Sequence, residues 1–90
     1  MPTVQLIIKG KVQGVFYRAS AKDVADDIGI VGWVKNTEEG NVEIMADGSK
    51  EQIEKLVEWC KKGPRRAVVT DVVVTEVDKQ NFKGFEVLRR

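Results

Sequence analysis

The sequence contains no histidine and a single cysteine, Cys60. Histidine is the commonest general base and metal ligand, so its absence excludes Ser-His and Cys-His catalysis and leaves no ligand set for a zinc site. One cysteine cannot form an internal disulfide, which favours a reducing, cytoplasmic location. No signal peptide is recognisable and no apolar run is long enough to span a membrane. We therefore expect a cytoplasmic protein without a membrane partner.

The sequence also lacks a marked excess of positive or negative charge. Lys and Arg number 15 and Asp and Glu number 14, which gives a net charge of +1. A general nucleic-acid binder needs a basic excess to displace counterions, so this balance argues against that function but still allows a local phosphate site. With 90 residues, 42% of them hydrophobic and 32% charged, the chain is typical of one globular domain over residues 1–90, and a monomer is the default expectation.

Hydrophobic periodicity predicts alternating strands and helices. A first helix is expected from Tyr17 to the helix-stopping Gly29, and a second after the capping box at Ser49–Gln52, ending at Lys61–Pro64. The order β-α-β-β-α-β favours an α+β fold, a ferredoxin-like βαββαβ sandwich in which two helices cover one face of an antiparallel sheet. Strands are expected at Thr3–Lys11, Val31–Thr37, Val42–Asp47 and Ala67–Val77, and Phe85–Leu88 is a candidate for a short final strand.

The segment Gly10–Arg18 carries two glycines and an arginine between the first strand and the first helix. Backbone N–H groups at the start of a helix have no partner within the helix, so such a junction is a natural anion site. The guanidinium of Arg18 adds a planar fork that suits phosphate oxygens. A cation in the first turn opposes the helix dipole, and a local rule broken beside a glycine-containing loop is typical of functional sites. The segment therefore predicts binding of a phosphorylated small molecule.

Topology predicts which other residue lies beside this loop. Two strands joined through a crossover helix run parallel, so their carboxyl ends share one edge of the sheet. Asn36 stands near the end of the second strand. We therefore expect Asn36 to lie beside the loop that ends in Arg18.

Two motifs resemble signatures of the acylphosphatase family. Residues 10–18 read G-x-V-Q-G-V-x-Y-R, and residues 32–42 read G-W-V-K-N-x-x-x-G-x-V, followed by Gly48. The resemblance covers essentially the whole chain. It implies the fold above and the hydrolysis of acyl phosphates to a carboxylate and inorganic phosphate, without a metal or other cofactor. It further implies that Asn36 positions the attacking water and that the phosphoryl group is bound by Arg18 with the loop amides of Gln13, Gly14, Val15, Phe16 and Tyr17.

The lack of histidine is compatible with this chemistry. The leaving group of an acyl phosphate is a carboxylate, whose acid has a pKa of roughly 4, so it departs without a general acid. What remains is to stabilise charge on the transferring phosphoryl group and to align the water. The amide of Asn36 does not titrate and cannot serve as the base. A phosphate oxygen of the substrate is our hypothesis for the proton acceptor.

Several of these residues can also be explained by an ordinary structural role. Arg18 could be a solvated surface residue, and Asn36 could be a turn residue before Glu38 and Glu39, whose adjacent carboxylates are not expected to form a pair. Phe16 and Trp33 are expected to pack rather than to contact substrate.

The segment Cys60–Arg66 fits C-x-x-G-x-x-R, the core of a cysteine-phosphatase phosphate loop. That loop needs its cysteine between a strand end and a helix start, where the helix lowers the thiol pKa. Here Cys60 is expected in the last turn of a helix, at the negative end of the dipole. The motif is therefore interpreted as coincidental.

Two other functions compete with hydrolysis. The first is a non-catalytic module of the same fold that binds acyl or carbamoyl phosphate. The second is an RNA-recognition module, which shares the element order but stacks bases on aromatic residues of its third strand. Val42–Asp47 has no aromatic residue. The expected partners are therefore a small acyl phosphate and inorganic phosphate, as product and inhibitor, and no nucleic acid.

Overall fold

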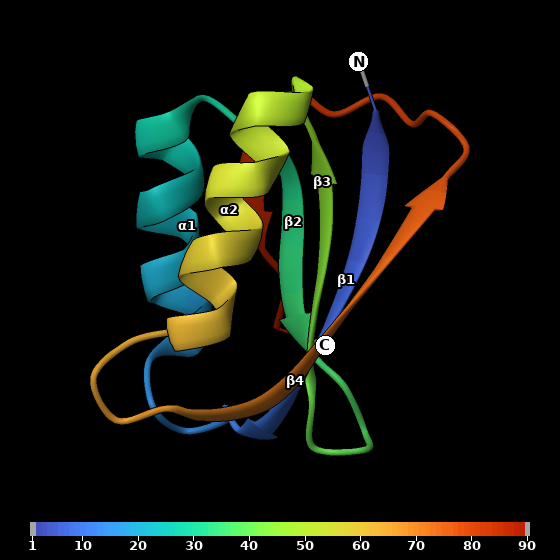
Figure 1. Cartoon of the computed structure of the whole chain (residues 1–90). Coiled ribbons are helices and arrows are strands. Elements are labelled where there is room, and N and C mark those ends of the chain that lie inside the picture. Colours follow the sequence, from blue (N-terminus) through green and yellow to red (C-terminus); the bar gives the residue numbers. More distant parts are fainter. Residues whose placement is uncertain (1, 90) are drawn as a thin grey trace.

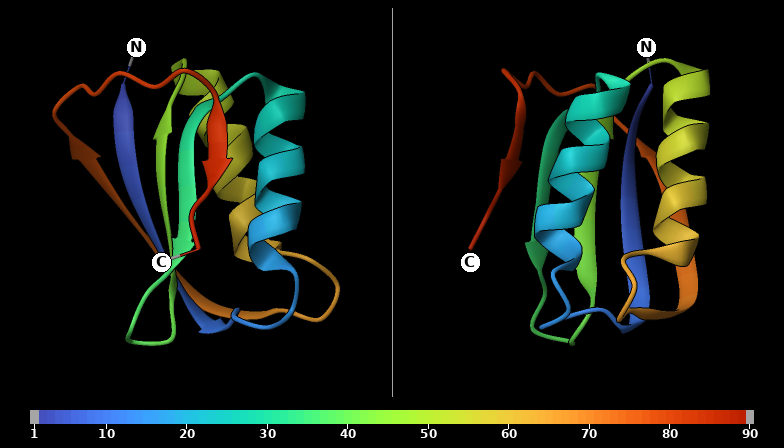
Figure 2. Two further views of the ribbon diagram at one scale, coloured as in Figure 1. Left: turned by 180° about the vertical axis from the view of Figure 1, so that it is seen from behind. Right: turned by 90° about the vertical axis from the view of Figure 1, so that its left-hand side faces the viewer.

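One five-stranded sheet, in the order β4-β1-β3-β2-β5, forms the framework of the protein in a computed structural model that describes residues 2–89. Helices α1 (Tyr17–Ile28) and α2 (Lys50–Lys62) cover one face of this sheet (Figures 1 and 2). The prediction of a ferredoxin-like α+β sandwich is confirmed. The strands are β1 (Thr3–Lys11), β2 (Val31–Asn36), β3 (Val42–Asp47), β4 (Val68–Val77) and β5 (Phe85–Val87).

The direction of β5 differs from the expectation of an antiparallel sheet. β1, β2, β3 and β4 pair antiparallel, but β5 pairs parallel with β2, with Gly32 opposite Phe85. The reason is the path of residues 78–84, which cross from the end of β4 to the far edge of the sheet at the end where β2 begins (Figure 2). A strand that starts there beside β2 must run in the same direction as β2.

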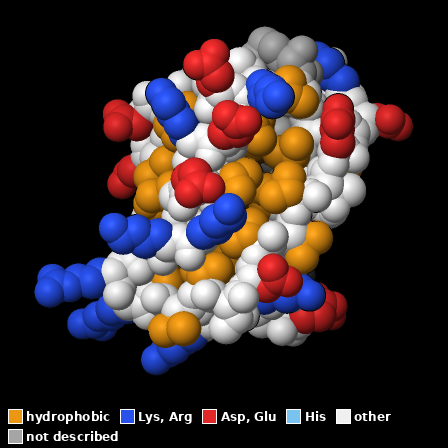
Figure 3. Space-filling model, viewed as in Figure 1, with side chains coloured by type: hydrophobic (Ala, Val, Ile, Leu, Met, Phe, Trp, Pro, Cys, Tyr) orange, Lys and Arg blue, Asp and Glu red, His pale blue; other side chains and the backbone are white. Residues whose placement is uncertain are grey.

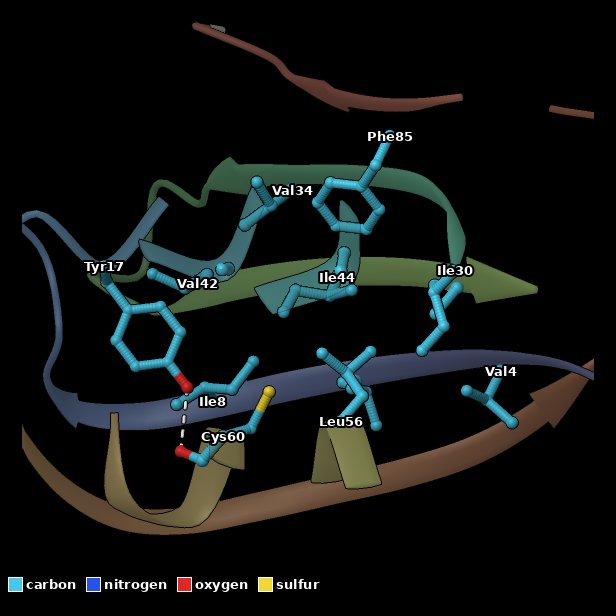
Figure 4. Close-up of a cluster of buried hydrophobic side chains, with 14 of the residues drawn as sticks. Val4, Ile8, Tyr17, Ile30, Val34, Val42, Ile44, Leu56, Cys60 and Phe85 are labelled. Carbon is cyan, nitrogen blue, oxygen red and sulfur yellow. Dashed lines mark hydrogen bonds between the residues drawn. The ribbon is translucent and has the colours of Figure 1, made fainter. Parts of the chain in front are cut away.

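The core lies between the sheet and the helices, as Figure 4 shows. Leu6 and Ile8 of β1 point toward the helices and are fully buried, and each contributes about 1.5–3 kcal/mol by leaving water. Ala21 and Ala25 of α1 are also fully buried, and their small side chains let this helix approach the sheet closely. No helix within residues 2–89 is long and apolar enough to cross a membrane.

The register places the ends of β1 and β2 at one edge of the sheet. Val42 of β3 pairs with Ile8 of β1 on one side and with Asn36 of β2 on the other. Since β3 is antiparallel to both neighbours, β1 and β2 are parallel, as the crossover argument predicts. Asn36 is thus level with Ile8, three residues before β1 ends at Lys11, and lies two strand spacings, about 10 Å, from the β1 backbone.

Candidate active site

The loop between β1 and α1 is anchored by three buried side chains. Val12, Val15 and Tyr17 are at most 5% exposed, whereas Gly14 and Phe16 are exposed. Gly14 has φ +73° and Phe16 has φ +64°, so both adopt the left-handed conformation. For a residue other than glycine this costs about 1–2 kcal/mol. The buried positions alternate with exposed ones, so the loop backbone is held against the core and turned outward at Gly14 and Phe16.

The start of α1 has no cap. Phe16 occupies the N-cap position and offers no side-chain hydrogen bond, and the first turn contains no acidic residue. The start of α2 is different, because Ser49 and Gln52 form a complete capping box there. Among the backbone hydrogen bonds of residues 2–89, none is donated by the N–H groups of residues 13–16. These groups and the first N–H groups of α1 are therefore free to bind an anion.

The side chain of Gln13 joins this loop to the hairpin that follows β2. Its Nε2 donates hydrogen bonds to the carbonyl oxygens of Thr37, at 2.9 Å, and Asn41, at 2.8 Å. Asn36 precedes Thr37 directly, so the same two bonds hold the loop beside Asn36. The sequence predicts a role only for the backbone amide of Gln13. Contacts across 24 and 28 residues leave no local signal by which this second role could have been found.

Arg18 and Asn36 line the same cleft, which has a volume of about 590 Å³. Gly14, Phe16 and Tyr17 also border it. The structure thus brings together most of the residues predicted for the site. Gln13 and Val15 do not line the cleft; the side chain of Val15 is buried in the core.

The guanidinium of Arg18 donates to a carbonyl oxygen and, among the described residues, is not paired with a carboxylate. Its Nη1 donates to the carbonyl oxygen of Leu88 at 3.0 Å, and no ion pair in the described part of the chain includes it. The contact with Leu88 spans 70 residues and was not foreseen from the sequence. It ties the arginine to the residue that follows β5, and Val87 at the end of β5 and Arg89 also line the cleft.

The packing role expected for Phe16 is wrong. Its side chain is 75% exposed, which is the largest exposed fraction given for a bulky apolar residue in the described chain, and it lines the cleft. The cause is the left-handed backbone at Phe16, which turns the side chain away from the core that its neighbours enter. Trp33 is half-buried, with Lys35 Nζ 5.3 Å from its ring centroid, and is not a lining residue of the cleft.

Cys60 lies in the last turn of α2 and is fully buried. Burial raises the pKa of its thiol from 9.0 to about 12, although a side-chain hydrogen bond with Tyr17 acts in the opposite direction. The hydroxyl of Tyr17 also donates to the Cys60 carbonyl at 2.8 Å (Figure 4). A thiol with so high a pKa is not a nucleophile at neutral pH, so this geometry supports a structural role for Cys60.

Comparison with known proteins agrees with the motifs. The sequence model of the acylphosphatase family matches residues 4–87. An acylphosphatase of Acaryochloris marina is 47% identical to this chain over 92 residues, which cover 99% of each protein. The crystal structure of the Bacillus subtilis acylphosphatase superposes with a TM-score of 0.94 and 36% identity, over 98% of this chain and 99% of that one.

A second kind of similar structure is larger. HypF of T. kodakarensis matches all of this chain with a TM-score of 0.87 and 28% identity, but the match covers only 12% of HypF. The same fold therefore also occurs as one part of a longer protein.

Proposed function

This chain belongs to the acylphosphatase family of enzymes, and we propose that it hydrolyses acyl phosphates with Arg18 and the β1–α1 loop binding the phosphoryl group and Asn36 positioning the water. The observation that carries this proposal is the cleft itself. Arg18 and Asn36, 18 positions apart in the sequence, line it together, and the uncapped start of α1 borders it.

The phosphoryl group is bound by backbone and guanidinium. The free N–H groups of residues 13–18 surround an anion from one side, and the dipole of α1 favours negative charge at this end. Arg18, which no carboxylate neutralises in the described chain, supplies a charged fork to the phosphate oxygens. These donors are fixed before the substrate arrives, so they stabilise the charge of the transition state without reorganisation.

Asn36 places the attacking water opposite the leaving group. A carboxamide both donates and accepts hydrogen bonds, so it orients a water without taking its proton. The phosphoryl transition state is loose and places little demand on a base. We assign the proton of the water to a phosphate oxygen of the substrate. The carboxylate then leaves without a general acid, because its acid has a pKa of roughly 4.

The proposal is tested by hydrolysis of benzoyl phosphate, with and without a chelator. Wild type is expected to turn over equally in both conditions, because no step is assigned to a metal. Arg18→Gln and Asn36→Ala should each lose about 10²-fold or more in kcat while staying folded. Inorganic phosphate should inhibit Asn36→Ala but not Arg18→Gln, which separates phosphoryl binding from water positioning. Full activity in either variant would remove that residue from the mechanism.

A second candidate is a non-catalytic module that binds acyl or carbamoyl phosphate, which we consider because HypF contains this fold as one part of a longer protein. Hydrolysis is preferred because the chain is 47% identical to an acylphosphatase over 99% of both proteins and only 28% identical to HypF. Binding of phosphate without turnover of any acyl phosphate would favour the module. A monomeric state and a cytoplasmic location stay predictions, and sedimentation of the purified chain tests the first.

A further inference from the structure

We propose that Phe16 determines which acyl groups the enzyme accepts, by giving the cleft an apolar wall that contacts aromatic or bulky acyl chains. This inference rests on the proposed function, because it places the phosphoryl group on Arg18 and the loop amides. It concerns the acyl half of the substrate, whereas the residues assigned above act on the phosphoryl group and the water.

The first support is that the backbone conformation of Phe16 lowers stability, and burial of its side chain offsets little of that loss. It is the sole non-glycine residue with positive φ within residues 2–89, a conformation that bulky side chains avoid. Its side chain is 75% exposed, so the ring gains little from burial. It has no polar atom with which to cap α1, although it occupies the N-cap position. Strained backbone of this kind is characteristic of ligand-binding positions.

The second support is the position of the ring. Phe16 stands two residues before Arg18 and lines the cleft that Arg18 and Asn36 share. Val15 and Tyr17, on either side, are buried and fix the backbone, so the ring is held at the rim of the phosphate-binding loop. An acyl group bonded to a phosphoryl group in this loop must extend along the cleft away from the amides.

Two small apolar side chains extend the apolar wall that Phe16 gives the cleft. Val87 of β5 and Ala19 of α1 border the same cleft, whose other lining includes the charged residues Lys22, Asp23 and Arg89. An aromatic ring contacts another ring more favourably than it contacts a methyl group, by about three- to tenfold in affinity. The substrates favoured by this cleft are therefore acyl phosphates with aromatic or large apolar acyl groups, compared with acetyl phosphate.

The experiment compares kcat/KM for benzoyl phosphate with kcat/KM for acetyl phosphate. The variants are Phe16→Gly and Phe16→Asn, which both tolerate positive φ, and Phe16→Tyr, which keeps the ring. Any change in the phosphate loop affects both substrates and cancels in the ratio. Val73→Ser is the matched control, since Val73 is 40% exposed on β4 and does not line the cleft.

The benzoyl-to-acetyl ratio should fall about three- to tenfold in Phe16→Gly and Phe16→Asn and stay at the wild-type value in Phe16→Tyr and Val73→Ser. Phe16→Gly should also unfold at the same or higher urea concentration than wild type, because glycine removes the strain. An unchanged ratio in the glycine and asparagine variants would overturn the inference, as would an equal fall in Val73→Ser. Arg18→Gln, assayed in parallel, reports on the proposed function separately.

Discussion

The Nε2 atom of Gln13 lies 2.8 Å from the carbonyl oxygen of Asn41, so the loop that follows β1 and the hairpin that follows β2 are joined by a side chain. The same atom also donates to the carbonyl oxygen of Thr37. In the proposed mechanism, the loop binds the phosphoryl group and Asn36, beside the hairpin, positions the water. Gln13 is the hydrogen-bonded link between them, and its loss should affect their relative placement.

Gln13→Ala should therefore reduce kcat more than it reduces affinity for inorganic phosphate. Removing the amide takes one donor from each of two carbonyl oxygens, which still accept from the N–H groups of Gly40 and Thr37, so it costs about 0.5–1.5 kcal/mol of stability. A shift of Asn36 relative to the loop should lower kcat by about ten- to a hundredfold. Gln5→Ala is the matched control, because Gln5 also donates a 2.8 Å bond, to Glu43, but does not border the cleft. Equal effects on kcat and phosphate inhibition would contradict the linking role.

Gly14→Ala should weaken phosphate binding beyond its effect on stability. Gly14 has φ +73°, and a Cβ there would meet no atom within 4 Å, so the substitution strains the backbone without causing a clash. The cost is about 1–2 kcal/mol. A shift of φ at this position also turns the neighbouring amides away from the anion.

Gly29→Ala provides the comparison for Gly14→Ala. Gly29 has φ +93° at the far end of α1, and a Cβ there would lie 3.2 Å from Nε2 of Gln52, which donates to the Ile28 carbonyl oxygen. Gly29→Ala should therefore lose at least as much stability in urea unfolding as Gly14→Ala, but only Gly14→Ala should lose inhibition by phosphate. If Gly29→Ala lost inhibition equally, the loss would reflect destabilisation of α1 rather than the loop.

Alkaline pH should destabilise the folded chain through Cys60 and Tyr17. Burial raises the pKa of Cys60 from 9.0 to about 12 and raises the pKa of Tyr17 above its ordinary 10.0. Above pH 9 the unfolded chain releases these protons while the folded chain retains them. The free energy of unfolding should therefore fall as pH rises from about 9 toward 12, by at most about 1.4 kcal/mol per pH unit for each group.

Urea unfolding between pH 7 and pH 11, with a reductant present, measures this decline. Cys60→Ala should be less stable than wild type at pH 7, because it leaves a small cavity in the core. It should show a shallower decline above pH 9, so the difference between the two proteins narrows. Parallel curves for the two proteins would show that the thiol does not contribute.

Local signals in the sequence were enough to predict most of the fold, but not every pairing. The capping box at Ser49–Gln52 and the glycine at position 29 mark helix ends through interactions within a few residues. The closeness of Arg18 and Asn36 follows from a general rule about crossover connections. The parallel pairing of β5 depends on where residues 78–84 cross the sheet, and the bond from Arg18 to Leu88 spans 70 residues. Contacts of this range have no periodicity to reveal them.

The exposed position of Phe16 shows a different limit. Aromatic residues are usually buried, and that tendency alone favours a packing role. Val15 and Tyr17 take the adjacent core positions, and the left-handed backbone at Phe16 leaves its ring outside. A hydrophobicity pattern does not report backbone handedness, so it could not distinguish a core aromatic from one that lines a site.

A basic cluster at the carboxyl end of α2 should accelerate the capture of anionic substrates. Figure 3 shows Lys and Arg side chains gathered at this end of the molecule. The turn after α2 lies against the start of α1, since a Cβ on Gly63 would come within 2.8 Å of the Tyr17 ring, and Tyr17 borders the cleft. The cluster consists of the exposed residues Lys61, Lys62, Arg65 and Arg66.

Reversing the charge of both Arg65 and Arg66 should therefore lower kcat/KM for acyl phosphates without changing kcat. At low ionic strength we expect a loss of about tenfold, which should disappear near 1 M salt, where screening acts within about 3 Å. Lys50→Glu is the control, because Lys50 is exposed at the opposite end of α2. Stopped assays at several salt concentrations give the slope of kcat/KM against ionic strength. A slope in the double variant as steep as that of wild type would mean that the cluster does not steer the substrate, and that the attraction comes from the start of α1 and the cations that line the cleft, Arg18 among them.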